Sequence, residues 1–246
     1  MDASTGCVAP AFARHPYFEP FVATASFALW VNLFRVIECG GVAAALASIF
    51  DVRKGTHVMR AGAAYAAGIA LLLRVVPKAD IDFRCPSASA LVGEVAYGLV
   101  LYDAVFFVLH RAMHESLWLN RLLGHRHHHR SAGERRRVRA SDVLDHSLVD
   151  GTLQVLANVL VQRYGPLGGP KNFLSRLVHN VVVTYLLTDS HADTPYRLSR
   201  LFPRLLKGAN DHHAHHRHSG PPYQQFFGYF DALFAPPDKK KKGAKS

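Results

Sequence analysis

Cysteine is scarce in this sequence, and several common signatures are missing from it. The three cysteines, Cys7, Cys39 and Cys85, are odd in number and widely separated, so they form no CxxC pair and suggest no disulfide framework. Residues 1–20 lack the basic start and apolar run of a cleavable signal peptide, and we expect none. Motifs of RNA- and DNA-binding proteins are also missing, so the net charge of +11 does not indicate nucleic acid.

Hydrophobic residues, 49% of the chain, gather into long blocks. Residues 88–109 form the best membrane span, because a helix of about 20 apolar residues crosses the hydrocarbon core of a bilayer. Residues 21–50 are interrupted by Arg35 and Glu38, which predicts one imperfect span or a helix with a break. Residues 61–76 form a shorter apolar block. These blocks indicate a helical membrane protein.

Two further apolar blocks, 147–162 and 172–190, are separated by a Gly/Pro-rich turn at residues 165–170. A turn of this composition between two apolar blocks predicts a helical hairpin. The hairpin would leave one membrane face and return to it.

The positive charge lies in loops beside the apolar blocks, in residues 51–60, 111–139 and the region after 191. The positive-inside rule places these regions in the cytosol and the charge-balanced loop 77–87 in the lumen. We therefore predict an all-α fold, a polytopic membrane bundle of about four or five spans with a cytosolic helical cap. The tail at 237–246 reads as a disordered, solvated end that also attracts anionic headgroups.

Three histidine clusters flank these apolar blocks, and their spacings resemble one another. His110 and His114 form an H-x3-H pair, and two H-x2-H-H clusters span residues 125–129 and 212–216. The i, i+4 spacing of the first pair places both rings on one face of a helix that extends the span at 88–109. With the predicted topology, all three clusters reach the cytosolic face.

Imidazole is a common ligand of iron, zinc and copper. The three clusters supply eight such rings, whereas one zinc ion needs about four ligands, so the count predicts two metal ions. The Glu-x-x-His motif of carboxylate-bridged di-iron bundles is missing from the clusters. The expected site is therefore a histidine-rich dimetal centre.

Other residues near the clusters have competing interpretations. Asp103 lies two helical turns before His110, where it could accept a ring N–H from a ligand histidine or hydrogen-bond a neighbouring helix, and both readings stay open. Six further histidines receive no metal-binding role: His15, His57, His127, His179, His213 and His218.

Residues 102–114, with the aromatic-rich helix ending in His110-Arg111-Ala112-Met113-His114, resemble the fatty acid hydroxylase / sterol desaturase superfamily. The histidines at 125–129 resemble its second box, and residues 223–234 resemble the segment after its third box. The resemblance covers about residues 95–236. It implies three segments: N-terminal spans at 1–87, a catalytic domain at 88–236 and the tail.

The resemblance implies an integral membrane, non-haem di-iron enzyme, of the endoplasmic reticulum if eukaryotic. Such enzymes hydroxylate or desaturate lipids with dioxygen and electrons from a reductase chain, so we expect a lipid substrate and a separate electron donor. Two further ligands are implied by position, His146 and His191. The full implied set is His110, His114, His125, His128, His129, His146, His191, His212, His215 and His216.

The chain departs from the family's pattern at four places. It has His213 where many relatives have Asp, Pro222-Tyr223-Gln224 in place of an Asn-Tyr-Gly turn, and Ala235 in place of Gly. His146 is followed by Ser147-Leu148 rather than by Pro and an acid. These departures leave the substrate open among fatty acyl chains, sphingoid bases, sterols and carotenoids, and leave an inactive scaffold relative as an alternative.

Two further functions compete with lipid oxidation. A metal transporter or buffer would need ionisable residues along a path within the spans. Five residues are candidates: Arg35, Glu38, Arg74, Glu94 and Asp103. A zinc hydrolase would need the glutamate of H-E-x-x-H, which the clusters lack.

Overall fold

The computed structural model describes residues 8–49, 52–75, 80–126, 128–129 and 138–234, and every regular element in them is a helix. Isolated bridges, such as Val8 with Arg84, are the only strand-like pairings in these residues. The all-α prediction is therefore confirmed. The tail at 237–246, His127 and the side chain of His57 lie outside the described residues, so their predicted roles stay predictions.

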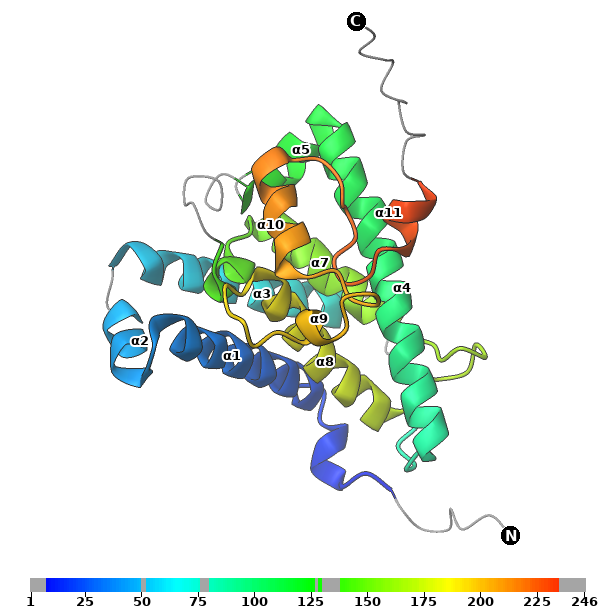
Figure 1. Ribbon diagram of the computed structural model, residues 1–246. Helices are drawn as coiled ribbons and strands as arrows, with labels where there is room; N and C mark the ends of the chain where they lie inside the picture. Colours follow the sequence, from blue (N-terminus) through cyan, green and yellow to red (C-terminus); the bar gives the residue numbers. More distant parts are fainter. Residues whose placement is uncertain (1–7, 50–51, 76–79, 127, 130–137, 235–246) are drawn as a thin grey trace, which may run out of the picture.

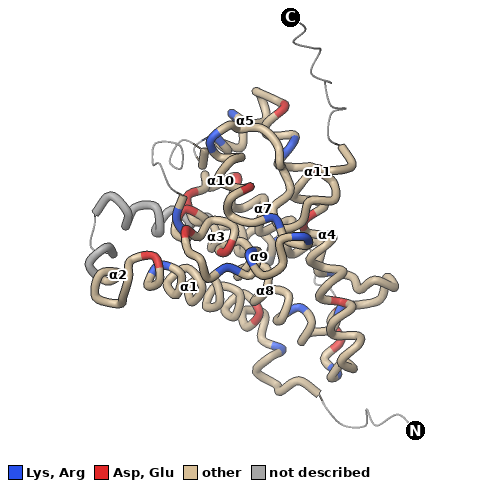
Figure 2. Tube along the Cα trace, viewed as in Figure 1, with Lys and Arg blue, Asp and Glu red and all other residues tan. Residues whose placement is uncertain are grey.

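The N-terminal part forms a short 3-10 helix, η1 (Ala11–Arg14), and then α1 (Phe18–Cys39), α2 (Val42–Ile49) and α3 (Val52–Val75). The predicted break falls between α1 and α2, where Gly40 has a left-handed φ of 75° that favours glycine. Figure 2 shows that the charged residues of α1 lie near its ends, with an uncharged middle.

α4 (Ala88–Glu115) is the longest described helix and carries the first histidine pair at its C-terminal end. The Ser87 side chain caps it by accepting a hydrogen bond from the Ala90 N–H at 3.2 Å. The short helix α5 (Leu117–Leu123) follows and ends at Gly124, whose φ is 69°. In Figure 1, α5 and α10 (Ala209–His218) lie at the same end of α4, and the short helix η1 lies at the other end.

The predicted hairpin is present as α7 (Leu148–Val161) and α8 (Phe173–His191). α8 is the central helix and packs against α1, α4 and α10, while α3 packs against α7. The remaining elements are η2 (Ala140–Leu144), α9 (Leu198–Leu201) and α11 (Tyr229–Leu233). Because α1 and α3 pack on the hairpin, the residues before 88 and after 88 contribute to one bundle.

Two described helices, α1 and α4, are long and apolar enough to cross a membrane. Only 22% of the apolar stretch of α1 and 28% of that of α4 is buried within the protein, whereas a core helix of a soluble protein is mostly buried. α7 is only 14 residues long, and α8 buries many polar side chains. The total of four or five spans and the cytosolic cap thus stay predictions.

The seam between α1 and α8 combines apolar packing with specific hydrogen bonds. Trp30 donates from Nε1 to the Val181 carbonyl at 3.1 Å, and the hydroxyls of Ser26 and Thr184 lie 3.2 Å apart. Such bonds inside an apolar bundle fix the register of two helices. α1 is therefore held in one position along α8.

The cysteines correct one expectation. Cys85 is disulfide-bonded, whereas Cys39, at the end of α1, is free. The expectation of no disulfide is therefore wrong for Cys85, because the spacing of cysteines along the chain does not report which of them meet in space.

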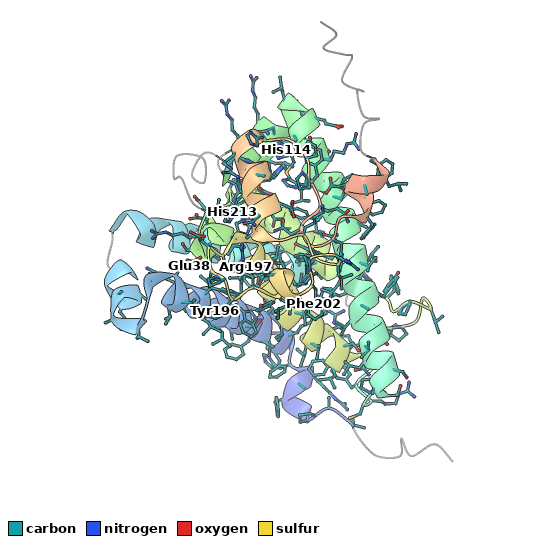
Figure 3. All side chains as sticks on the ribbon, in the orientation of Figure 1. Glu38, His114, Tyr196, Arg197, Phe202 and His213 are labelled. Atoms are coloured by element: carbon teal, nitrogen blue, oxygen red, sulfur yellow. The ribbon has the colours of Figure 1, made fainter. Side chains whose placement is uncertain are left out.

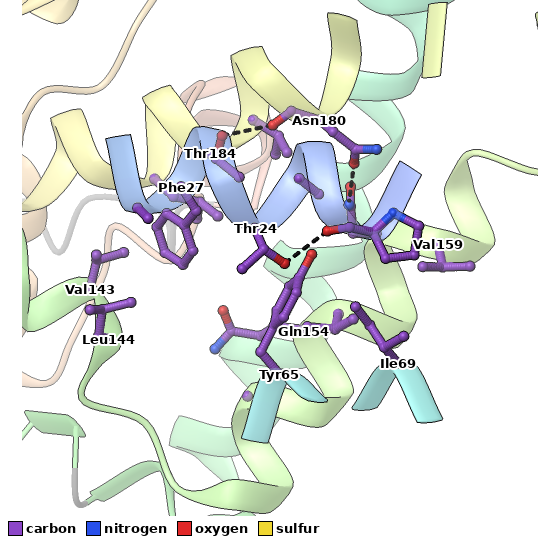
Figure 4. Close-up of a pocket in the computed structure, with 18 of the residues that line it drawn as sticks. Thr24, Phe27, Tyr65, Ile69, Val143, Leu144, Gln154, Val159, Asn180 and Thr184 are labelled. Carbon is purple, nitrogen blue, oxygen red and sulfur yellow. Dashed lines mark hydrogen bonds between the residues drawn. The ribbon is translucent and has the colours of Figure 1, made fainter. Parts of the chain in front are cut away.

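A cavity of about 1950 Å³ runs through the bundle. It is lined by residues of α1, α3, α7 and α8, and at one end by His110, His128 and His191. Most of its wall is apolar, including Phe27, Ile69 and Val159, three of the residues labelled in Figure 4. The cavity connects the histidine-rich end of the bundle with its opposite end.

Candidate metal centre

The three histidine clusters meet at one end of the bundle. His110 and His114 project from the last turns of α4, with ring centroids 4.9 Å apart. The second cluster follows α5, and its described residues are helical. Three histidines of the third cluster are buried on α10. Figure 3 shows His114 at the end of the molecule where α5 and α10 lie.

The rings separate into two groups, within each of which the candidate ligand atoms lie within 4.8 Å of one another. Group 1 consists of His110, His114, His125, His129 and His215. Group 2 consists of His128, His191, His212 and His216. The structure therefore brings together nine of the ten histidines that the resemblance implied, and it divides them between two adjacent centres.

The ring nitrogens have the separations expected of ligands that share an ion. Nε2 of His212 lies 3.0 Å from Nε2 of His191 and 3.0 Å from Nε2 of His216. In group 1, Nε2 of His129 lies 3.2 Å from Nε2 of His125. Two nitrogens that bind one ion at about 2.1 Å, at 90° to 109° to each other, are roughly 3.0–3.4 Å apart. The residues thus fit a metal in both groups.

In several rings the other nitrogen is already committed to a carbonyl. Nδ1 of His110 donates to the Tyr223 carbonyl at 2.7 Å, and Nδ1 of His191 donates to the Leu187 carbonyl at 2.9 Å. His128 and His215 make the same kind of bond, to the carbonyls of Asp145 and Gly220. A carbonyl only accepts, so each Nδ1 carries the proton and each Nε2 keeps its lone pair for a metal.

Burial keeps these rings neutral. It lowers the pKa of His129 and of His215 to about 3, and it holds the pKa of His212 well below its usual value. Nε2 of His114 and Nε2 of His215 are buried without a hydrogen-bond partner. A buried polar nitrogen without a partner is costly, and a shared metal ion would satisfy both.

Asp150 of α7 is the carboxylate that supports the histidines. Its Oδ2 accepts from Nδ1 of His125 at 3.0 Å, and its Oδ1 accepts from the Gln154 side chain at 3.1 Å. The Asp150 side chain is fully buried. A carboxylate that accepts from the second ring nitrogen orients a ligand histidine and raises its basicity. We did not predict this residue from the sequence.

His146 is the one implied ligand that the structure leaves outside both groups. Its ring stacks on His128 with centroids 4.1 Å apart, and its Nδ1 lies 3.2 Å from Oδ2 of Asp150. His146 thus forms part of the wall around group 2. The resemblance placed it by sequence position alone, where the expected following Pro was already missing.

Asp103 has different partners from those of a ligand-orienting carboxylate. It accepts hydrogen bonds from the Gln224 side chain and from the N–H groups of Gln225, Phe226 and Phe227, at 2.7–3.2 Å. Seven residues of helix separate it from His110, about 10 Å along the axis, which is too far for a direct bond. In the structure Asp103 fixes the segment 224–227, and these four bonds go to that segment rather than to a histidine ring.

That segment reaches both groups. Tyr223, directly before it, accepts from His110 of group 1. Gln225 donates from Nε2 to the Ser190 hydroxyl at 2.7 Å, and this hydroxyl lies 3.2 Å from Nδ1 of His191 of group 2. One segment thus links α4 and α8 beside both groups of rings.

Four further described histidines are not members of either group. His218 is exposed on α10, and His213 lies 3.3 Å from the carbonyl of His191. His179 is buried far along α8, where it faces Asn158. His15 lies near the N-terminus beside Tyr17. None of these four rings belongs to either described group.

The acidic residues considered for a metal path are bound to separate backbone segments. Glu38 accepts from the N–H groups of Ala140 and Asp193 at 2.9 and 2.8 Å, and Glu94 accepts from the Asn172 N–H at 2.9 Å. With Asp103 on segment 224–227, these three carboxylates stabilise loops. They do not form a continuous conduit.

A comparison with known protein families finds one match. The family model described as fatty acid hydroxylase matches residues 95–235, which is more than half of the chain and includes all three histidine clusters. No curated protein and no solved structure matches the chain.

Proposed function

The chain belongs to the fatty acid hydroxylase family, and from this premise we propose that it is an oxygen-dependent hydroxylase or desaturase of a membrane lipid. The observation that carries the proposal is the pair of histidine groups at one end of a long, mostly apolar cavity. A lipid chain that enters this cavity would bring a C–H bond to the metals.

We assign one iron ion to each group. Imidazole suits iron, and five nitrogens in group 1 exceed the four ligands of tetrahedral zinc. Bound iron would supply the activation of dioxygen, and the protein would supply geometry and a dry pocket. Hydroxylation converts C–H, O2, two electrons and two protons to C–OH and water. Desaturation consumes the same O2, electrons and protons, removes two hydrogens from the lipid to form C=C, and releases two waters.

The chain's own residues prepare the site for this reaction. The carbonyls of Tyr223, Leu187 and Asp145 fix the tautomers of three rings, and Asp150 orients His125. Rings held in this way need no reorganisation when metal binds. The apolar cavity wall keeps bulk water from the reacting carbon and holds the substrate chain in line.

We further propose that the metal end faces the cytosol, in the endoplasmic reticulum if the source is eukaryotic, and that a separate electron donor delivers the electrons. The proposal follows from the basic segments around the histidine clusters. Arg111 and Arg139 are two described examples from these segments.

The test compares three variants in cells that express the full chain: His215→Ala of group 1, His128→Ala of group 2 and His218→Ala as the control. His218 lies on the same helix as His215 but is exposed and outside both groups. Untargeted lipid mass spectrometry should find a lipid that gains one oxygen or loses two hydrogens with the native chain and with His218→Ala only.

Metal content separates the alternatives. The purified native chain should hold two iron ions per chain, and each ligand variant should hold fewer. Two bound irons without any lipid product, with electron donors present, would favour a scaffold or metal-handling protein. Turnover retained in His128→Ala or His215→Ala would contradict the assignment of these ligands.

A further inference from the structure

The part of the cavity wall distant from the two histidine groups contains a cluster of three carboxamides. Asn158 and Gln162 of the α7 side lie one turn apart, and Asn180 of α8 faces them. All three line the cavity. Polar side chains inside a membrane bundle are uncommon and usually mark a functional site.

An ion pair fixes which way each carboxamide points. Glu19 of α1 pairs with Arg176 at 2.9 Å and accepts from Nδ2 of Asn180 at 3.2 Å. Since a carboxylate only accepts, Oδ1 of Asn180 must face the other two amides, and it accepts from Nδ2 of Asn158 and Nε2 of Gln162, each at 3.0 Å. The network thus assigns every amide without ambiguity.

One acceptor in this network has no partner. Oε1 of Gln162 is buried and unpaired, because its Nε2 is the atom bound to Asn180. A buried carbonyl oxygen without a donor costs stability, and a ligand that donates a hydrogen bond removes that cost. Arg176 is already engaged with Glu19 and with the Gln162 backbone carbonyl, so it is not available to bind a carboxylate.

We propose that Gln162, with Asn158 and Asn180, is a subsite for the polar end of the substrate, and that this end donates a hydrogen bond. The chemical class is a long-chain lipid with a hydroxyl or an amide N–H, rather than an ester, a thioester or a carboxylate. This inference rests on the proposed function only for the identity of the ligand as substrate.

The position of the subsite sets the position of oxidation. Asn180 and His191 lie on the same helix, eleven residues and about 16 Å apart. Figure 4 shows apolar side chains, Phe27, Val143 and Leu144, on the side of the cavity opposite Val159. A substrate anchored at the carboxamides would cross this apolar part, so the oxidised carbon lies far from the polar end.

Further hydroxyls surround the same region. Thr24 of α1 and Tyr65 of α3 line the cavity, and in Figure 4 Thr24 lies between Asn180 and Tyr65. The Thr24 hydroxyl donates to the Pro20 carbonyl at 2.8 Å, and the Tyr65 hydroxyl is hydrogen-bonded to the same Thr24 side chain. Both helices would therefore contribute to the environment of a polar end group.

The experiment measures binding to the purified full chain and needs no turnover. Tritiated 1-hexadecanol is the probe, and unlabelled 1-hexadecanol and hexadecyl methyl ether are the competitors. The ether has the same chain but cannot donate. The native chain should prefer the alcohol about tenfold, the effect of one hydrogen bond to an otherwise unsatisfied buried acceptor.

Gln162→Leu should abolish this preference, whereas Leu160→Val, a change at an exposed position of the same helix outside the cavity lining, should keep it. Equal competition by alcohol and ether in the native chain, or an unchanged preference in Gln162→Leu, would show that the carboxamides serve packing alone and would overturn the subsite.

A second probe tests the direction of binding. A 1-hexadecanol with a diazirine at the far end of its chain should label peptides of η2 or the end of α8, beside the histidine groups. In Gln162→Leu the label should be distributed over more peptides. Labelling confined to α1 residues near Glu19 would overturn the orientation. Neither binding assay uses turnover. The subsite can therefore be confirmed when no lipid oxidation is found, and it can be contradicted when lipid oxidation is found.

Discussion

Oδ2 of Asp150 lies 3.0 Å from Nδ1 of His125 and joins α7 to the second histidine cluster. The same oxygen faces His146, and the other oxygen of the carboxylate holds Gln154. One buried carboxylate therefore organises two rings and a carboxamide at the point where the cavity meets the candidate metal centre.

Asp150→Asn should weaken metal binding by about 10- to 100-fold. The amide oxygen of Asn accepts less strongly from the His125 ring, and the new NH2 group would face the NH2 group of Gln154, which also donates. Competition with a chelator of known affinity would measure the loss. Asp80→Asn, an exposed acid at the opposite end of the cavity, is the control. Equal affinity in Asp150→Asn and the native chain would remove Asp150 from the supporting shell.

Asp103→Asn should loosen the segment 224–227, because the variant replaces one of two acceptor oxygens that together hold four donors. Bonds to a charged buried acceptor contribute about 1.5–3 kcal/mol each, so the apparent melting temperature should fall by several degrees. Glu115→Gln, an exposed change on the same helix, should leave it unchanged.

A readout at the metal site distinguishes Asp103→Asn from a variant that is only less stable. Since Tyr223 meets His110 and Gln225 reaches His191 through Ser190, the visible spectrum of the cobalt-substituted chain should change in Asp103→Asn. A lower melting temperature with an unchanged spectrum would restrict Asp103 to a structural role.

The sequence predicted the parts of this protein that follow from local periodicity. The i, i+4 spacing of His110 and His114 placed both rings on one helix face, the interruption at Arg35 and Glu38 indicated a break in the first apolar block, and the turn at 165–170 separated the two helices of the hairpin. The apolar run at 88–109 correctly located most of α4. These features depend on neighbours within one or two turns.

The features that could not be predicted from the sequence depend on contacts between distant segments. Asp103 and Asp150 are both buried acids near histidines in the sequence, yet only Asp150 touches a histidine ring. The partners of Asp103 come from a segment more than 120 residues later. The division of the rings into two groups also arises from the crossing of α4, α8 and α10, which no local pattern encodes.

Lys171, between α7 and α8, should make stability depend on pH. Burial lowers its pKa from 10.5 to about 8, so between these values the unfolded chain holds more protons and stability rises with pH. Below pH 8 the buried charge costs at most about 3 to 4 kcal/mol, from about 1.4 kcal/mol per pKa unit.

Lys171→Met should therefore raise the apparent melting temperature at pH 7 by several degrees and flatten its rise between pH 8 and 10.5. Thermal unfolding in detergent across this range would measure both effects. Lys207→Met, a change at a partly exposed lysine, should keep the native pH dependence. A lower melting temperature for Lys171→Met at pH 7 would mean that attraction to Glu94 exceeds the cost of burial.

Cys39 offers a direct test of orientation. It follows Glu38, whose carboxylate is bound to Ala140 and Asp193, so it lies at the histidine end of the bundle, whereas the disulfide-bonded Cys85 precedes the first turn of α4 at the other end. Disulfides persist on the oxidising side of a membrane and free thiols on the reducing side.

In sealed microsomes with the cytosolic face outward, a membrane-impermeant maleimide should label Cys39 without detergent. Peptide mass spectrometry would locate the label, and Cys39→Ser should lose it. Labelling of Cys39 only after permeabilisation would place the histidines in the lumen and reverse the proposed topology.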